Sequence, residues 1–217
     1  MSVLSGIFIV LLAGALLAIW HNGRIQRREA FIREYMLPKG LYDKLLKRRP
    51  ELTQKDCALI SRGLRQFFLA FAKSGGKYVS MPSQVADDLW HEFILYTRSY
   101  EVFCRRAFGQ FLHHTPAVVL ASNQRTNDGL KRTWWHACKE ENIDPKNPSR
   151  LPLLFALDAK FGIKDGFRYT PDCKEARLRG NGSSYCAGDI PSSGCGGGLG
   201  CTGGGSGCGG GGCGGGD

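Results

Sequence analysis

The sequence predicts an all-α protein with an N-terminal transmembrane helix, a helical bundle-like domain and a disordered tail rich in glycine and cysteine. Three observations predict this class. An uncharged apolar segment opens the 217-residue chain, apolar residues then recur at helical spacing, and glycine dominates the C-terminal end. We expect the transmembrane anchor to occupy residues 1–23, the helical domain residues 24–175 and the tail residues 176–217.

The first apolar segment, residues 3–20, has the length of a membrane-spanning helix. At about 1.5 Å per residue it extends roughly 27 Å, the short end of what crosses a bilayer. Trp20 lies where an interfacial aromatic residue belongs. Arg24, Arg27 and Arg28 follow it, whereas no Lys or Arg precedes the segment. The positive-inside rule then predicts a single-pass protein of the cell membrane whose C-terminal body is cytoplasmic.

Two alternatives exist for this segment. A cleaved signal peptide would need a basic start and a small-residue cleavage site. The chain instead begins Met-Ser-Val, and Ala-Ile-Trp-His is a poor cleavage site. The segment could also be a buried core helix.

In the part of the chain after the first apolar segment, apolar residues recur at the spacing that is typical of helices. Thr53 opens a sequence that resembles a capping box closed by Asp56, and Ser83 is suited to be an N-cap. Gly75 and Gly109 follow apolar runs that they would end, and strand signals are almost absent. The expected helices cover residues 21–36, 41–49, 53–75, 84–108, 124–142 and 151–161.

The chain is basic, with 29 Lys and Arg against 19 Asp and Glu and a formal net charge of +10. Such a charge attracts nucleic acid or an anionic membrane surface. The basic residues are spread along the chain and form no known nucleic-acid-binding module. We therefore expect the membrane as a partner through the N-terminal helix, no nucleic acid, and a protein partner of unknown identity.

Chemistry-bearing residues gather between residues 81 and 116, where three of the five histidines lie. Asp87 precedes His91 by four residues, so both side chains share one helix face. Imidazole and carboxylate groups ligate zinc and other divalent metals. We expect a metal site that draws on Asp87, His91, His113 and His114, with only one of the two adjacent histidines joining His91.

Cys104 and His136 are further candidate ligands. Four ligands on different elements would close a structural site, whereas three would leave a reactive position. The alternative is a packing role, because an Asp–His pair at this spacing is common on helices. The chain also lacks the His-Glu-x-x-His and paired Cys-x-x-Cys patterns of specific metal motifs.

Other chemistries find no support in the sequence, and no catalytic residue can be assigned. There is no nucleophile-elbow serine, phosphate-binding loop or dinucleotide-binding fingerprint. Cys57, Cys104 and Cys138 fall inside expected helices, where we expect them to be buried as small hydrophobic residues.

The tail contains five cysteines, Cys186, Cys195, Cys201, Cys208 and Cys213. Their spacing is looser than that of zinc knuckles, so no preformed zinc site is expected. In a reducing cytoplasm these thiols would be free. They would then take up soft metal ions, undergo modification or crosslink. The alternative is a low-complexity tail with no function of its own.

Three segments carry a family resemblance: DDLWHEFILYTRSYEVFC (87–104), FGQFLHHTP (108–116) and LPLLFALDAKFGI (151–163). Together with the Cys-Gly tail, they resemble bacterial proteins of the glycine-rich domain-containing family. The D-x-x-W-H portion is more remotely similar to plant glycine-rich domain proteins, which have a second histidine where this chain has Phe93. The resemblance implies a membrane-attached helical domain and implies no reaction. The departure at Phe93 weakens the transfer of any site built on paired histidines.

We expect the chain to be a membrane-anchored helical binding or scaffolding module that carries a metal. The alternative is a metal-dependent enzyme built on His91, His113 and His114, with one open coordination position. As a third hypothesis, the cysteine tail is the functional part and the helical domain presents it. Convergence of the histidines on one site would favour the enzyme, and scattered histidines would favour the scaffold.

Overall fold

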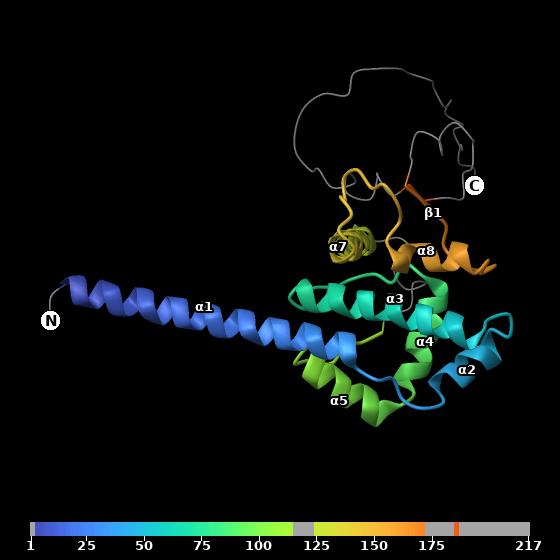
Figure 1. The fold of residues 1–217 in the computed structure, drawn as a ribbon, viewed down its shortest axis with the longest axis horizontal. Coiled ribbons are helices and arrows are strands. Elements are labelled where there is room, and N and C mark those ends of the chain that lie inside the picture. The colour runs from blue at the N-terminus through green and yellow to red at the C-terminus, as the bar shows by residue number, and fades with distance from the viewer. Residues whose placement is uncertain (1–2, 115–123, 172–184, 187–217) are drawn as a thin grey trace, which may run out of the picture.

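The computed structural model describes residues 3–114, 124–171 and 185–186 of the chain. The described residues are predominantly helical, which confirms the all-α class (Figure 1). The helices are α1 (Val3–Glu34), α2 (Leu41–Arg48), α3 (Gln54–Lys73), α4 (Gln84–Ile94), α5 (Thr97–Ala107), α7 (Gln124–Glu140) and α8 (Leu153–Lys160).

Helix α1 joins the expected anchor to the domain without interruption. Its N-terminal part projects from the body, and its C-terminal part packs against the body (Figure 1). The stretch Ile7–Glu34 is long and apolar enough to cross a membrane. The mean hydropathy of its apolar 18-residue window is 1.6, and none of that window is buried. A signal sequence near the N-terminus passes the same test of length and composition. There is no break at the boundary expected between residues 23 and 24.

Apolar and ionic contacts hold the C-terminal part of α1 to the domain. Ile32 is fully buried in the core. Glu140, at the end of α7, lies 2.8 Å from Arg33 of α1 and 2.7 Å from Lys73 of α3. Glu29 also pairs with Arg33, at 3.2 Å, and with Lys73, at 3.5 Å. This ion cluster joins three helices at one point.

Helix α3 lies at the centre of the domain and packs against α1, α4, α7 and α8 (Figure 1). The predicted capping box at its start is confirmed: Thr53 Oγ1 accepts from the Asp56 N–H, and Asp56 accepts from the Thr53 N–H. Its buried face carries Phe67 and Phe68, which both contact the Trp90 ring of α4. The domain is therefore built around one aromatic core.

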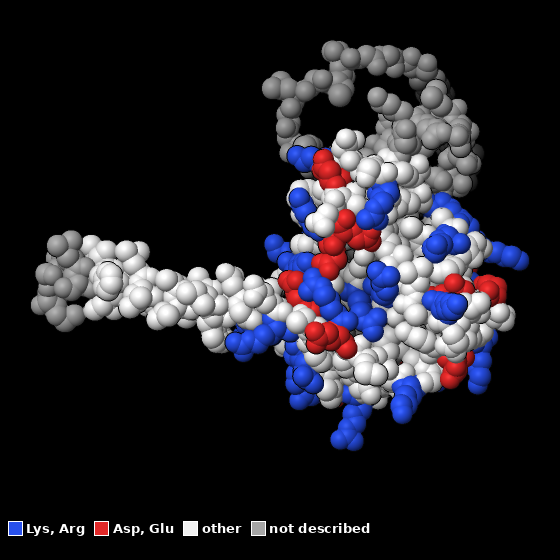
Figure 2. Space-filling view, in the orientation of Figure 1, with Lys and Arg blue, Asp and Glu red and all other residues white. Residues whose placement is uncertain are grey.

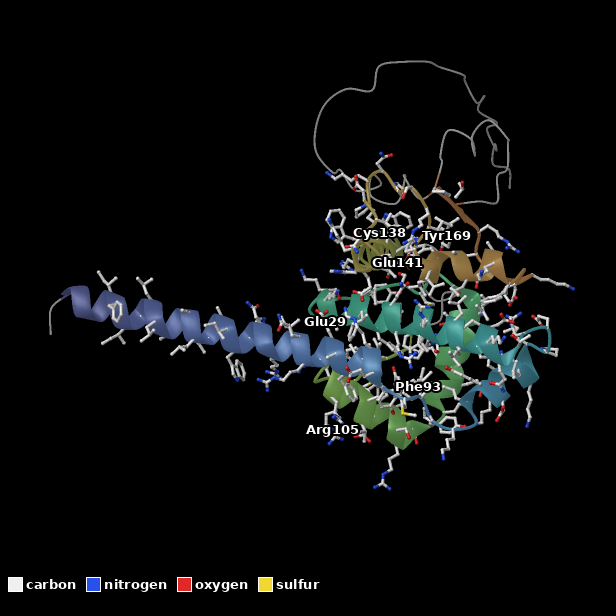
Figure 3. The ribbon with its side chains drawn as sticks, viewed as in Figure 1. Glu29, Phe93, Arg105, Cys138, Glu141 and Tyr169 are labelled. Carbon is white, nitrogen blue, oxygen red and sulfur yellow. The ribbon has the colours of Figure 1, made fainter. Side chains whose placement is uncertain are left out.

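The single helix expected over residues 84–108 is wrong, because the chain turns at Leu95 and Tyr96 and forms α4 and α5. Phe93 lies where these two helices meet (Figure 3), and its ring centroid is 5.4 Å from that of Phe103. Ten residues of continuous helix would separate the two positions by about 15 Å. The turn therefore lets the apolar faces of both helices share one core.

A short parallel pair of strands follows the helices. β1 (Tyr169–Thr170) pairs with β2 (Tyr185–Cys186). β2 falls within the segment 176–217 that we expected to be a disordered tail. The remainder of that segment, including Cys195, Cys201, Cys208 and Cys213, lies outside the described residues.

The three cysteines expected in the core are buried there, which confirms the prediction. Burial raises the pKa of Cys57 and of Cys104, and it raises the pKa of Cys138 to about 12. These thiols are therefore protonated at neutral pH and poor nucleophiles.

Glu140→Gln should make the domain less sensitive to acid. Burial opposes ionisation of Glu140, but hydrogen bonds from Lys73 and Arg33 outweigh it and hold the pKa of this carboxyl below its ordinary value of 4.5. A carboxyl with a depressed folded-state pKa stabilises the fold fully above its unfolded-state pKa. That contribution is lost as the pH falls through the folded-state pKa.

The measurement is urea unfolding of the full chain in detergent between about pH 5 and about pH 3. The free energy of unfolding should fall less across this range in Glu140→Gln than in the wild type. Glu51→Gln changes an exposed position, and its free energy of unfolding should fall as much as that of the wild type. Equal losses in all three proteins would contradict the role given to Glu140.

Candidate metal centre

Helix α4 presents Asp87 and His91 on one face, four residues apart. The start of this helix is fixed by the buried carboxylate of Asp158 in α8. Asp158 accepts hydrogen bonds from Ser83 Oγ at 2.8 Å, from the Gln84 N–H at 2.7 Å and from the Val85 N–H at 3.1 Å. Ser83 Oγ in turn accepts from the backbone of the first turn, as its predicted N-cap role requires. The two candidate ligands therefore stand on a helix whose N-terminus cannot shift freely.

Two buried hydrogen bonds connect the segment after α5 to α4. The Trp90 indole Nε1–H donates to the Tyr100 hydroxyl at 3.1 Å, and that hydroxyl donates to the Leu112 carbonyl at 2.6 Å. Burial raises the pKa of Tyr100, so its hydroxyl keeps the proton that it donates. Anchored at Leu112, the chain places His114 edge-on to the Trp90 ring, with centroids 4.7 Å apart.

Asp87, His91 and His114 meet at this point. The Nε2 of His114 lies 3.0 Å from Oδ1 of Asp87, and Nδ1 of His91 lies 3.4 Å from Oδ2 of the same carboxylate. The two imidazole centroids are 4.0 Å apart. One ligand atom from each residue falls within 4.8 Å of the other two. The side chains of Asp87 and His114 are 19% and 12% exposed, and that of His91 is 39% exposed, so the cluster lies at the surface with one accessible side.

This donor set fits a divalent metal. Zinc bonds to nitrogen and oxygen are about 2.0–2.1 Å long, so two ligand atoms of a tetrahedral site lie about 3.3 Å apart. The 3.0 Å between His114 and Asp87 is close to that spacing. The backbone carbonyl of Asp87 accepts a hydrogen bond from His91 Nδ1–H at 2.9 Å, which leaves Nε2 of His91 with a free lone pair. Orientation of a ligating imidazole by a carbonyl is usual around metals.

The same geometry also has a metal-free interpretation. In that case His114 Nε2–H donates a hydrogen bond to Asp87 Oδ1, and the cluster is a packed polar group beside Trp90. The contacts are consistent with both interpretations. A metal titration distinguishes the two, because only the first predicts that a metal binds.

The structure leaves His113, the neighbour of His114, outside the cluster. Its side chain is exposed, and its ring lies 4.8 Å from that of Phe111. Consecutive residues of an extended segment point in opposite directions, so only one of the two histidines can face α4. The anchoring of Leu112 selects His114.

The other two candidate ligands lie elsewhere. Cys104 is buried in α5. His136 is on α7, where burial and the nearby charge of Lys73 lower its pKa, partly opposed by Glu29. Neither belongs to the group formed by Asp87, His91 and His114 among the described residues.

Sequence reasoning missed the residues that position the site. No pattern in the sequence assigned Trp90, Tyr100 or Asp158 a role at the site. Asp88, next to Asp87, points the other way: its side chain is 1% exposed and binds Arg49 at 2.8 Å. Only the adjacency of Trp90 to His91 could have suggested a role at the site.

The fold and the cluster define a small all-α domain, preceded by a helix apolar enough to cross a membrane, with a three-residue candidate metal centre on its surface. Residues 27–190 match the UCP032817-like family, and the chain therefore belongs to this family. The matched region contains the whole cluster and leaves out the most apolar part of α1 and the glycine-rich end. No curated protein and no solved structure is similar enough to the chain to count as a match.

Tyr100→Phe should destabilise the domain by roughly 1–3 kcal/mol, because it leaves the buried Trp90 N–H and Leu112 C=O without their shared partner. Urea unfolding of the full chain in detergent measures this loss. Hydrogen exchange of residues 109–114 should also quicken as the segment detaches from α4. Tyr96→Phe is the matched control, since the Tyr96 hydroxyl makes an exposed hydrogen bond to the Lys39 carbonyl at 3.2 Å. Equal stability of the two variants would contradict the positioning role of Tyr100.

Proposed function

We propose that this protein is a membrane-anchored binding module whose helical domain holds zinc or another divalent metal through Asp87, His91 and His114. The observation that carries the proposal is the convergence of two imidazoles and one carboxylate from α4 and from a segment 27 residues further along the chain. Neutral imidazole and ionised carboxylate together form a donor set that divalent metals prefer over water.

The surroundings support this role. The backbone carbonyl that binds His91 Nδ1–H selects the tautomer that a metal needs on Nε2. The Trp90 ring backs His114, so this imidazole is nine-tenths covered and held in one orientation. A preorganised donor set of this kind loses little conformational entropy when a metal binds.

The anchor belongs to the same proposal. The uncovered apolar part of α1 is followed by Arg24, Arg27 and Arg28, and this charge asymmetry favours a cytoplasmic domain on a single-pass protein of the cell membrane. The domain would then act at the inner membrane surface, where it binds or organises a protein partner.

A metal-dependent enzyme is a second candidate. The meeting of His91 and His114 at Asp87 is the arrangement that we expected to favour it, and the number of ligands supports it as well. Catalytic zinc sites keep three protein ligands and an open position, and two histidines with one carboxylate also suit non-haem iron. The residues that directly follow His114, TPAVVLASN (115–123), include no His, Cys, Asp or Glu. His91 is 39% exposed, so a small molecule can approach the site. A metal held there would supply Lewis acidity and an activated water.

Metal titration of the full chain tests the first proposal. Because the tail thiols would also bind zinc, the protein should carry serine at Cys186, Cys195, Cys201, Cys208 and Cys213. In competition with a chromogenic chelator, this protein in detergent should bind one Zn²⁺ per chain. Asp87→Ala, His91→Ala and His114→Ala should each weaken binding by at least ~100-fold, more than the loss of an outer-shell partner.

His113→Ala is the matched control, because it removes an adjacent exposed imidazole and should leave the affinity unchanged. If His113→Ala weakens zinc binding as much as His114→Ala does, the assignment of the ligands is wrong. If the folded protein binds no zinc, manganese, cobalt or iron, the metal proposal fails and the packing interpretation holds.

Cobalt substitution separates the two candidate functions. In a site with an open position, azide added to the Co²⁺-loaded protein should change the visible absorption spectrum, because it becomes a further ligand. The His91→Ala variant should lose the cobalt spectrum itself. A spectrum that does not respond to azide would favour a closed structural site and the binding module over the enzyme.

A further inference from the structure

A groove lies on the face where α1 ends and where α3 meets α7 and α8. Its volume is about 690 Å³, within the range of small-molecule sites. Basic and acidic side chains crowd this face (Figure 2), and Glu141 stands beside the end of α7, over α3 (Figure 3). The groove shares no residue with the candidate metal centre.

Positive charge exceeds negative charge around the groove. Five cations and three carboxylates line it or bind its lining residues: Arg33, Arg62, Arg65, Lys73 and Arg150, with Glu29, Glu140 and Glu141. The three carboxylates are already engaged. Glu29 and Glu140 bind Arg33 and Lys73. Glu141 pairs with Arg150 and accepts from the Leu153 N–H at 2.6 Å.

Of these five cations, Arg62 and Arg65 are the two that have no carboxylate partner among the described residues. In the part of the chain that the structure describes, no Asp or Glu lies within ion-pair distance of either guanidinium. Arg65 is half-buried, and its N–H groups donate to two neutral acceptors, Ser61 Oγ and the Tyr35 carbonyl, each at 2.9 Å. Burial lowers the pKa of Arg65. A partly buried cation without a counter-charge costs free energy that an anion would recover.

The rest of the lining is apolar. Leucine and alanine side chains from α3, from the loop before α8 and from α8 line it: Leu59, Leu69, Leu151, Leu153 and Ala156. A hydrated inorganic anion would not use this surface. The lining therefore suits a ligand with a charged group for the arginines and an apolar body.

We propose that this groove binds a small phosphate monoester with an apolar or aromatic body, whose phosphate lies between Arg62 and Arg65. A phosphate monoester carries about −1.5 to −2 charges at neutral pH, which matches the two unpaired guanidinium groups. The planar guanidinium fork binds phosphate oxygens in pairs, which a single lysine cannot do. This site is independent of the proposed metal centre.

The test uses 1-naphthyl phosphate and the full chain in detergent, treated with EDTA so that no metal can hold the phosphate. Isothermal titration calorimetry should give a dissociation constant below about 1 mM. Arg62→Gln and Arg65→Gln should each weaken binding by at least ~10-fold, because each removes charged hydrogen bonds. Arg98→Gln, at an exposed arginine of α5, is the matched control and should bind as the wild type does.

Companion ligands separate the parts of the proposal. Inorganic phosphate and 1-naphthoate should both bind more weakly than 1-naphthyl phosphate. Inorganic phosphate that binds equally well would overturn the apolar half of the proposal, and 1-naphthoate that binds equally well would overturn the phosphate half. No binding up to about 1 mM, or equal weakening by Arg98→Gln, would overturn the site itself. Arg62 is exposed, so its variant keeps the test decisive if Arg65→Gln does not fold.

Discussion

Two buried hydrogen bonds, from Trp90 to Tyr100 and from Tyr100 to the Leu112 carbonyl, hold the segment after α5 against α4. They cross the turn between α4 and α5 and fix the segment that leaves α5. Trp90, Tyr100 and Leu112 are all buried, so a path of the chain that breaks these bonds would leave two buried polar groups without this partner. The position of His114 beside Asp87 is a direct consequence.

A second constraint links α1 to the domain. Ile32 is buried in the core, and the ion cluster around Glu140 ties the last turns of α1 to α3 and α7. Since α1 continues without a break from the apolar segment into these contacts, no linker separates the apolar segment from the domain. Arg33, at the end of α1, also lines the groove, so α1 contributes to a candidate binding surface.

The candidate metal centre and the groove differ in the charge that they would bind. The first gathers groups that complement a cation: a carboxylate, two imidazoles and a carbonyl that orients one of them. In the groove, Arg62 and Arg65 have no carboxylate partner among the described residues, and much of the remaining lining is apolar. They lie on different helices, α4 for one and α3 with α7 and α8 for the other. The two proposed sites therefore do not overlap, and their ligands would carry opposite charges.

Local patterns were enough to predict where the helices lie, apart from the break at Leu95 and Tyr96, and to predict part of the site. The capping box at Thr53, the N-cap at Ser83 and the glycines that end helices act over one turn, so they can be read from neighbours in the chain. The pairing of Asp87 with His91 is equally local, because four residues make one turn of helix. The apolar and uncharged start of α1 could likewise be recognised from composition.

Tertiary packing decided the rest. The turn at Leu95 and Tyr96 carries no strong local signal, since its cause is the contact between Phe93 and Phe103 across the two helices. The choice of His114 over His113 depends on the hydrogen bond that ties Leu112 to Tyr100, twelve residues earlier in the chain. The lack of a carboxylate partner for Arg65 depends on the carboxylates that other cations bind. Sequence alone determined what each segment tends to form, because those preferences act over a few residues. Only the tertiary structure decided which side chains are in contact, because these contacts depend on how residues far apart in the chain pack together in one core.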